Sequence, residues 1–194
     1  MQNLASIERV ALEGIEHEPM LAQVQHWAAT NSGSHNLAGL KETADMLADA
    51  FAILPGEIKL KQPAPVDRVR ADGVIETVEH GRHLVLTVRP QAPVQLLFTG
   101  HMDTVFPADH AFQHQRWLDE GILNGPGVAD MKGGIAVMLA AIKAAETAPE
   151  FGQIGYQVMI NSDEEVGSPS SATLITELAK NKVAALTYEP ALPD

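Results

Sequence analysis

The sequence predicts an α/β protein, built as a three-layer α/β/α sandwich around a largely parallel central sheet. Strand-like and helix-like segments alternate along the second half of the chain, which is typical of parallel strands joined by crossover helices. Several of the strand-like segments are apolar at nearly every position, as expected for strands that helices cover on both faces. The length of 194 residues suits one compact domain with a substantial core.

The expected elements follow in chain order. Apolar residues at helical spacing predict helices over residues 6–16, 19–29 and 37–51. Residues 63–72, with two prolines and a charged run, are expected to form an irregular or edge segment. Apolar runs predict strands over residues 84–89, 94–99, 154–160 and 183–188, the last three of them buried. Further helices are expected over residues 133–146 and 168–180, the second with Ser168 as its N-cap and Pro169 in its first turn.

Composition excludes several classes of protein and site. The net charge is −12 and the basic residues are not clustered, which argues against a nucleic-acid partner. The chain has no cysteine, so disulfides and thiolate zinc sites are excluded and any metal must be held by histidine and carboxylates. The first residues lack the pattern of a secretory signal, and no apolar stretch is long enough to span a bilayer. We therefore expect a cytoplasmic enzyme with no membrane partner.

Polar side chains that can bind metal follow three predicted strands at the point where each strand ends. In chain order these side chains are His101 and Asp103, then Asp163, Glu164 and Glu165, then Glu189. Ligands in open α/β sheets gather beyond the carboxyl ends of the strands, so we expect these residues to meet. Asp130 joins them from a glycine-rich loop, residues 125–130, just before a predicted helix. One imidazole and several carboxylates suit Zn²⁺, Co²⁺ or Mn²⁺.

His101 and Asp103 suggest a metal ligand and the acidic residue that orients it. His101 can offer one ring nitrogen to a metal. Asp103, two residues on, points to the same side of an extended backbone and can accept the other ring N–H, which fixes the tautomer. Asp130 has two oxygens and can bridge two metal ions.

The glutamates suggest the remaining roles. Glu164 and Glu165 are adjacent, so their side chains diverge, and one can bind metal while the other acts as general base toward a water molecule. Glu189 would complete the ligands of the first metal.

Taken singly, each motif also has an ordinary structural explanation. A lone histidine at a strand end is usually structural, and we assign only structural or incidental roles to the other seven histidines: His17, His26, His35, His80, His83, His110 and His114. A nucleotide-binding loop at residues 125–134 is excluded by residue type. Asp130 occupies the place of the third glycine of the dinucleotide fingerprint, and Lys132 is followed by glycine rather than serine or threonine. All the motifs together, at one end of one sheet, favour the metal site.

Four motifs, in this order, also carry a resemblance to a known family. They are residues 100–107 (GHMDTVFP), 125–134 (GPGVADMKGG), 162–168 (SDEEVGS) and the pair Glu189-Pro190. They resemble the motifs of the metallohydrolase family that contains glutamate carboxypeptidase, aminoacylase, acetylornithine deacetylase and succinyl-diaminopimelate desuccinylase. The first and last motifs look most similar to the glutamate carboxypeptidase branch. The turn at residues 32–34 also resembles the N-terminal region of the family.

The resemblance implies a zinc-peptidase-like fold and a cofactor of two divalent metal ions, zinc with cobalt or manganese as alternatives. It implies that His101 and Glu189 bind one ion, that Glu165 binds the other and that Asp130 bridges them. A cis peptide bond just after the bridging aspartate, between Asp130 and Met131, is also implied.

For catalysis, the resemblance implies that Glu164 is the general base and that Asp103 orients His101. The implied reaction is hydrolysis of an amide or peptide bond in a small-molecule substrate, an N-acyl amino acid or a short peptide with a free carboxylate.

The resemblance also gives an expectation for domain organisation. Residues 1–194 are expected to be the N-terminal part of the catalytic domain, incomplete at the C-terminus. The lid domain, through which the parent enzyme would form a homodimer, and the returning segment with a last metal-binding histidine have no counterpart in the sequence. An alternative is a truncated, inactive metal-binding or scaffold fragment. A second alternative, a glycosidase with a pair of carboxylates, leaves His101, Asp103 and the Asp130 loop unexplained.

Overall fold

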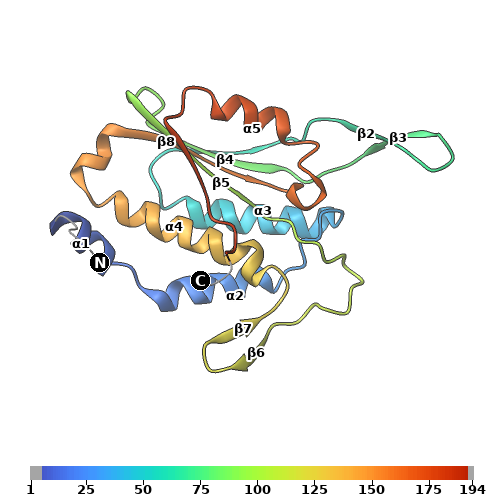
Figure 1. Cartoon of the computed structure of the whole chain (residues 1–194), viewed down its shortest axis with the longest axis horizontal. Helices are drawn as coiled ribbons and strands as arrows, with labels where there is room; N and C mark the ends of the chain where they lie inside the picture. The colour runs from blue at the N-terminus through green and yellow to red at the C-terminus, as the bar shows by residue number, and fades with distance from the viewer. Residues whose placement is uncertain (1–5, 192–194) are drawn as a thin grey trace.

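The computed structural model describes residues 6–191 and shows the predicted three-layer α/β/α arrangement (Figure 1). Within these residues, one face of the central sheet is covered by α3 (Leu37–Phe51) and α4 (Gly134–Ala145), and α2 (His17–Ala28) packs against α4 on the side away from the sheet. The opposite face is covered by α5 (Ala172–Ala179). The short α1 (Ser6–Glu13) lies beside α4. The predicted fold class is confirmed.

Within the same residues, the central sheet has five strands in the order β1-β4-β8-β5-β9. Their bounds are Glu57–Lys61 (β1), His83–Val88 (β4), Val94–His101 (β5), Ile154–Asn161 (β8) and Ala184–Thr187 (β9). β5 pairs in parallel with β8 and β9, whereas β4 is antiparallel to both of its neighbours, β1 and β8. β4 alone is therefore reversed in this sheet, which is largely parallel as predicted.

Cores on both faces of the sheet explain why its strands are apolar at successive positions. Along β4, Leu84 and Leu86 belong to the main core, which includes residues of α2, α3 and α4. Val85, between them, belongs to a second core under α5, with Leu97, Met159, Leu174, Ile175 and Leu178. Because neighbouring strand residues point to opposite faces, a strand covered on both sides buries every position.

The last strand differs from its prediction. The sequence predicts a buried strand over residues 183–188, but β9 is exposed at all four of its positions. β9 lies at the edge of the sheet and is paired with β5, and no strand within residues 6–191 pairs with its other side. The expected burial is therefore wrong, because apolar composition alone does not distinguish an edge strand from an inner one.

The start of the last helix also differs. The sequence predicts Ser168 as an N-cap, but α5 begins at Ala172, and its N-cap, Ser171, makes no side-chain cap hydrogen bond. Ser168 instead has a left-handed backbone, with φ of 57°. Its N–H donates to the carbonyl of Asp163 and its hydroxyl accepts from Asn161, so a turn that closes the loop after β8 takes precedence over helix capping.

Two hairpins project away from the central sheet (Figure 1). One pairs β2 (Val66–Val69) with β3 (Ile75–Val78), so residues 63–72 are partly strand, outside the main sheet. The other pairs β6 (Arg116–Asp119) with β7 (Ile122–Asn124). The sequence patterns do not predict β1 or the β6–β7 hairpin, because these strands are short and mostly exposed.

The remaining helical segments of residues 6–191 are short. They are η1 (Val128–Gly133), which is interrupted by non-helical backbone at Asp130 and Met131, and the 3₁₀ turns η2 (Pro149–Gln153) and η3 (Glu164–Val166). Among the helices of residues 6–191, none combines the length and apolar character that crossing a membrane requires.

Candidate metal centre

The register of the parallel strands brings the predicted site residues to one rim of the sheet. His101, the last residue of β5, pairs with Asn161, the last residue of β8, and Glu164 and Glu165 follow three and four residues later. On the other side of β5, Thr99 pairs with Thr187 of β9, and Glu189 lies two residues beyond Thr187 just as His101 lies two residues beyond Thr99. The strand ends therefore deliver these side chains to the same place.

Asp130 reaches this rim from the loop between β7 and α4. The loop turns at Gly127, whose φ of 69° suits glycine, and it contains the expected cis peptide bond between Asp130 and Met131. It packs against the chain after β9 at Gly134, where a Cβ atom would lie 2.0 Å from the carbonyl oxygen of Tyr188. Glycine at position 134 thus allows the Asp130 loop to lie directly beside the segment that carries Glu189.

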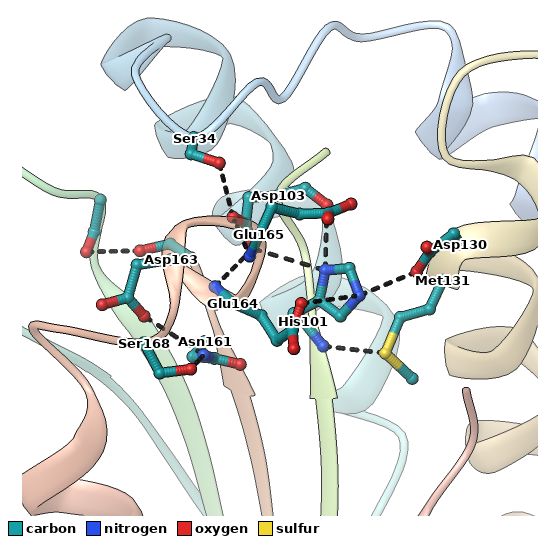
Figure 2. Close-up of polar contacts among 12 residues, drawn as sticks. Ser34, His101, Asp103, Asp130, Met131, Asn161, Asp163, Glu164, Glu165 and Ser168 are labelled. Atoms are coloured by element: carbon teal, nitrogen blue, oxygen red, sulfur yellow. Dashed lines mark hydrogen bonds and ion pairs between the residues drawn. The ribbon is translucent and has the colours of Figure 1, made fainter. Parts of the chain in front are cut away.

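The buried ring of His101 is surrounded by carboxylates (Figure 2). Its Nε2 lies 3.0 Å from Oδ1 of Asp130, 3.6 Å from Oε2 of Glu189 and 3.9 Å from Oε2 of Glu164. Its backbone N–H donates to the sulfur of Met131 across 3.0 Å. The side chain of His101 is 1% exposed, whereas those of the three acids are 42–53% exposed, so the acids open the site toward solvent.

Asp103 connects three segments of the site through hydrogen bonds. Its buried carboxylate accepts a 2.7 Å hydrogen bond from the hydroxyl of Ser34 and 3.1 Å bonds from the backbone N–H groups of Glu164 and Glu165. Nδ1 of His101 lies 3.0 Å from the backbone carbonyl of Asp103 and 3.4 Å from its Oδ1. The contact expected between these two residues is present, with the carbonyl as the nearer acceptor. The orienting role itself stays a prediction.

The donor set fits a divalent cation. Ligand atoms of His101, Asp130 and Glu165 all lie within 4.8 Å of one another. One imidazole nitrogen among carboxylate oxygens is the set that zinc and related ions accept. Together with the distances to Glu164 and Glu189, the structure brings the expected metal ligands and the expected base to one centre. Of the side chains expected to meet there, Asp163 does not join them, because its carboxylate is occupied by hydrogen bonds from Ser170 and Ser171.

The electrostatics of the centre show an excess of negative charge. Burial lowers the pKa of His101, but the hydrogen bond and charge of Asp103, with the charges of Glu189 and Glu164, outweigh burial and raise that pKa to about 9. Burial raises the pKa of Glu165, and repulsion from Asp130 raises it further. Burial and repulsion from Asp130 likewise raise the pKa of Glu189, against the opposing effect of His101. A cation bound here would relieve this repulsion.

A second polar network lies behind the glutamates, centred on the fully buried Asp163. Its carboxylate accepts hydrogen bonds from the hydroxyls and backbone N–H groups of Ser170 and Ser171 and from the side chain of Asn161. The buried His83 joins this network through Ser162 and Ser170, in keeping with the structural role expected of it. Asp163 therefore fixes the loop that carries Glu164 and Glu165 and does not itself reach the metal centre.

Sequence reasoning missed Ser34 and Lys132 as parts of the site. Ser34 is 69 residues from its partner Asp103, and nothing in the sequence signals the pairing. Lys132 is 1% exposed, and its ammonium group donates to the carbonyl of Thr30, which ties the Asp130 loop to the chain after α2. Burial lowers the pKa of Lys132 to about 8. Its position in a glycine-rich motif gave the only sequence signal.

Comparison with known proteins adds independent findings. The model of a family described as "Peptidase family M20/M25/M40" matches residues 97–194. Carboxypeptidase G2 of Pseudomonas sp. (strain RS-16) is 33% identical over 150 residues, which are 76% of this chain and 34% of that protein. Succinyl-diaminopimelate desuccinylase of Methylobacterium nodulans is 37% identical over 109 residues, which are 51% of this chain and 27% of that protein. The chain thus spans between about a quarter and a third of the length of these curated relatives.

The fold also matches solved structures. Human carnosine dipeptidase 1 superposes with a TM-score of 0.72 over 95% of this chain and 41% of that chain, at 17% sequence identity. At this level of identity the similarity shows a shared fold and does not by itself transfer a function.

Proposed function

The chain belongs to the peptidase family M20/M25/M40, and from this premise we propose that it forms the metal-binding part of a hydrolase that cleaves amide or peptide bonds. The substrate would be an N-acyl amino acid or a short peptide with a free carboxylate. The observation that carries the proposal is the convergence of His101, Asp130 and Glu165 from three separate segments. The sequence similarity to carboxypeptidase G2 and to the desuccinylase supports the choice of reaction.

Two divalent ions, zinc with cobalt or manganese as alternatives, are part of the proposal. His101 and Glu189 would hold one ion, Glu165 would hold the other, and Asp130 would share its two oxygens between them. The crowding of acids around one imidazole supports this assignment, since burial and, after it, repulsion from Asp130 raise the pKa of Glu165 and of Glu189 when no cation is present. When bound, the ions would supply Lewis acidity toward the substrate carbonyl and toward water.

Glu164 is assigned the proton transfers. Its carboxylate is half exposed and lies 3.9 Å from the ring of His101, at the open side of the centre. It would take a proton from the attacking water and return that proton to the nitrogen of the leaving amine. The carboxylate of Asp103 accepts hydrogen bonds from the backbone N–H groups of Glu164 and Glu165. It would thereby position both the general base, Glu164, and the metal ligand, Glu165.

Replacing the base tests this proposal. The variant Glu164→Gln keeps the shape of the side chain but cannot accept the proton, so we expect it to bind metal normally and to lose amide hydrolysis. Glu150→Gln, at an exposed position of η2, is the control and should hydrolyse as the wild type does. Normal hydrolysis by Glu164→Gln would refute the assigned role.

A metal-binding or scaffold function without catalysis is the alternative candidate. The matches cover 34% and 27% of the two curated relatives, so the activity of the whole relatives is only proposed for this chain. An amidase assay on the chain, with and without added zinc, separates the two. Zinc-dependent hydrolysis supports the enzyme, whereas zinc binding without hydrolysis supports the scaffold. Homodimer formation and a cytoplasmic location stay predictions from the sequence.

A further inference from the structure

A cavity opens directly beside the candidate metal centre. Its volume is about 500 Å³, and it is formed by the loop before α3, the loop after β5 and the turn that follows β8. The residues that line it are Ser34, His35, Asn36, Thr104, Val105, Pro107, Ala108, Glu165 and Val166. Glu165 therefore belongs both to the metal centre and to the cavity wall, so the cavity adjoins the metal centre.

Hydrogen bonds between its loops hold the cavity open. The backbone N–H of Ser34 donates to the carbonyl of Thr104, and the N–H of Thr104 donates to the carbonyl of Ser32. The side chain of Asn31 donates to the carbonyl of Phe106 across 3.0 Å. These bonds join two segments about 70 residues apart, so the cavity is preformed and a ligand would not have to order its walls.

The chemistry of the walls favours an uncharged group. Val105 and Val166 are 59% and 41% exposed, which leaves apolar surface uncovered on two of the segments that line the cavity. Among residues 6–191, neither lysine nor arginine lines it, and its ionisable residues there are His35 and Glu165. An apolar group would bury the valines and gain about 25 cal/mol for each Å² removed from water. A carboxylate would lie near Glu165 without a lysine or arginine partner.

The positions of Glu164 and Glu165 indicate which end of a substrate would enter the cavity. In the proposed reaction Glu164 returns a proton to the leaving amine, so the amine must lie on the side of Glu164. Glu164 does not line the cavity, whereas Glu165 does. The acyl group lies on the other side of the scissile bond from the amine, and hence on the cavity side.

We propose that this cavity is the subsite for the acyl group of the substrate and that it selects neutral, apolar or aromatic acyl groups over acyl groups that carry a carboxylate. The inference rests on the proposed function for the direction of the substrate. It places this protein with hydrolases of neutral N-acyl amino acids rather than with desuccinylases.

Binding to the zinc-loaded chain tests the inference without relying on turnover. The probes are N-benzoylglycine and N-succinylglycine, which differ only in the acyl group, and the measurement is isothermal titration calorimetry. We expect N-benzoylglycine to bind at least tenfold more tightly, and we expect the methyl NMR signals of Val105 and Val166 to shift when it binds. Equal affinity, tighter binding of N-succinylglycine, or no binding of N-benzoylglycine would overturn the inference.

Two variants locate the effect. Ala108→Phe should fill the cavity and reduce the preference for the benzoyl probe at least fivefold, whereas Ala71→Phe, in the exposed turn between β2 and β3, should not change it. Val105→Lys changes an exposed side chain, keeps the fold and adds a cation, so it should strengthen binding of N-succinylglycine at least threefold. An unchanged preference in Ala108→Phe together with no gain in Val105→Lys would place the acyl group elsewhere.

The subsite and the reaction can fail separately. If the chain hydrolyses benzoyl and succinyl substrates equally well, the proposed function stands and the subsite is wrong. If the chain binds the benzoyl probe selectively but Glu164→Gln hydrolyses normally, the cavity is a binding site and the assigned mechanism is wrong.

Discussion

Metal binding at this centre is expected to displace a proton from His101. The ring is buried, and Asp103, Glu189 and Glu164 raise its pKa to about 9 in the metal-free chain, although burial acts in the opposite direction. At pH 7 the ring therefore carries two protons. Nε2, which faces Asp130 across 3.0 Å, must lose its proton before it can bind a metal.

The size of the effect follows from the distance between the pH and this pKa. Each pH unit below the pKa costs a factor of ten, or about 1.4 kcal/mol, in apparent affinity. Since the pKa of His101 is about 9, the apparent affinity for metal at pH 7 is about 100-fold lower than the affinity of the deprotonated ring. Apparent affinity should rise about tenfold between pH 7 and pH 8 and level off above pH 9.

Calorimetry of zinc binding in buffers of different ionisation enthalpy measures the protons released. At pH 7 we expect the wild type to release close to one proton from His101 for each chain that binds metal there. The control His26→Gln, an exposed residue in the last turn of α2, should release the same number. Release near zero, with an affinity that does not change between pH 6.5 and pH 8, would refute the electrostatic account of the centre.

Three further predictions concern single side chains. Asp130→Ala should remove both metal ions, and unchanged metal content by elemental analysis would count against bridging. Ser34→Ala deletes the 2.7 Å hydrogen bond to the buried Asp103 and should weaken zinc binding by roughly tenfold, the equivalent of about 1.4 kcal/mol, in a zinc titration against a competing chelator; an unchanged affinity would contradict the supporting role. Asp163→Ala leaves buried donors of Ser170 and Ser171 unpaired and should lower the free energy of unfolding by about 3 kcal/mol in urea denaturation, so a loss below about 1 kcal/mol would disprove the network's importance.

The rim of the sheet was predictable because parallel strands place their carboxyl ends together. His101 and Glu165 follow apolar runs that fold as the neighbouring strands β5 and β8, so their meeting follows from the strand pattern. Glu189 was placed by the same rule, although its strand is an exposed edge rather than a buried one. The ends of strands are thus better determined by the sequence than their positions in the sheet.

Contacts between distant segments were not predictable. Ser34 reaches Asp103 from a turn before α3, and the sequence marks that turn without indicating what it touches. Ser168 resembles a helix N-cap in the sequence, but its N–H donates to the backbone carbonyl of Asp163 and its hydroxyl accepts from Asn161, and the helix starts later. In both cases the role of the serine is set by a hydrogen-bond partner that the local sequence pattern does not indicate.

Anomalous diffraction at the zinc edge, from crystals of the zinc-loaded chain, tests the central claim most directly. The account predicts a peak at bonding distance, about 2.0–2.2 Å, from Nε2 of His101 and from an oxygen of Asp130, with a second peak bonded to Asp130 and Glu165. Peaks that avoid His101, or a chain that retains no zinc at neutral pH, would contradict it.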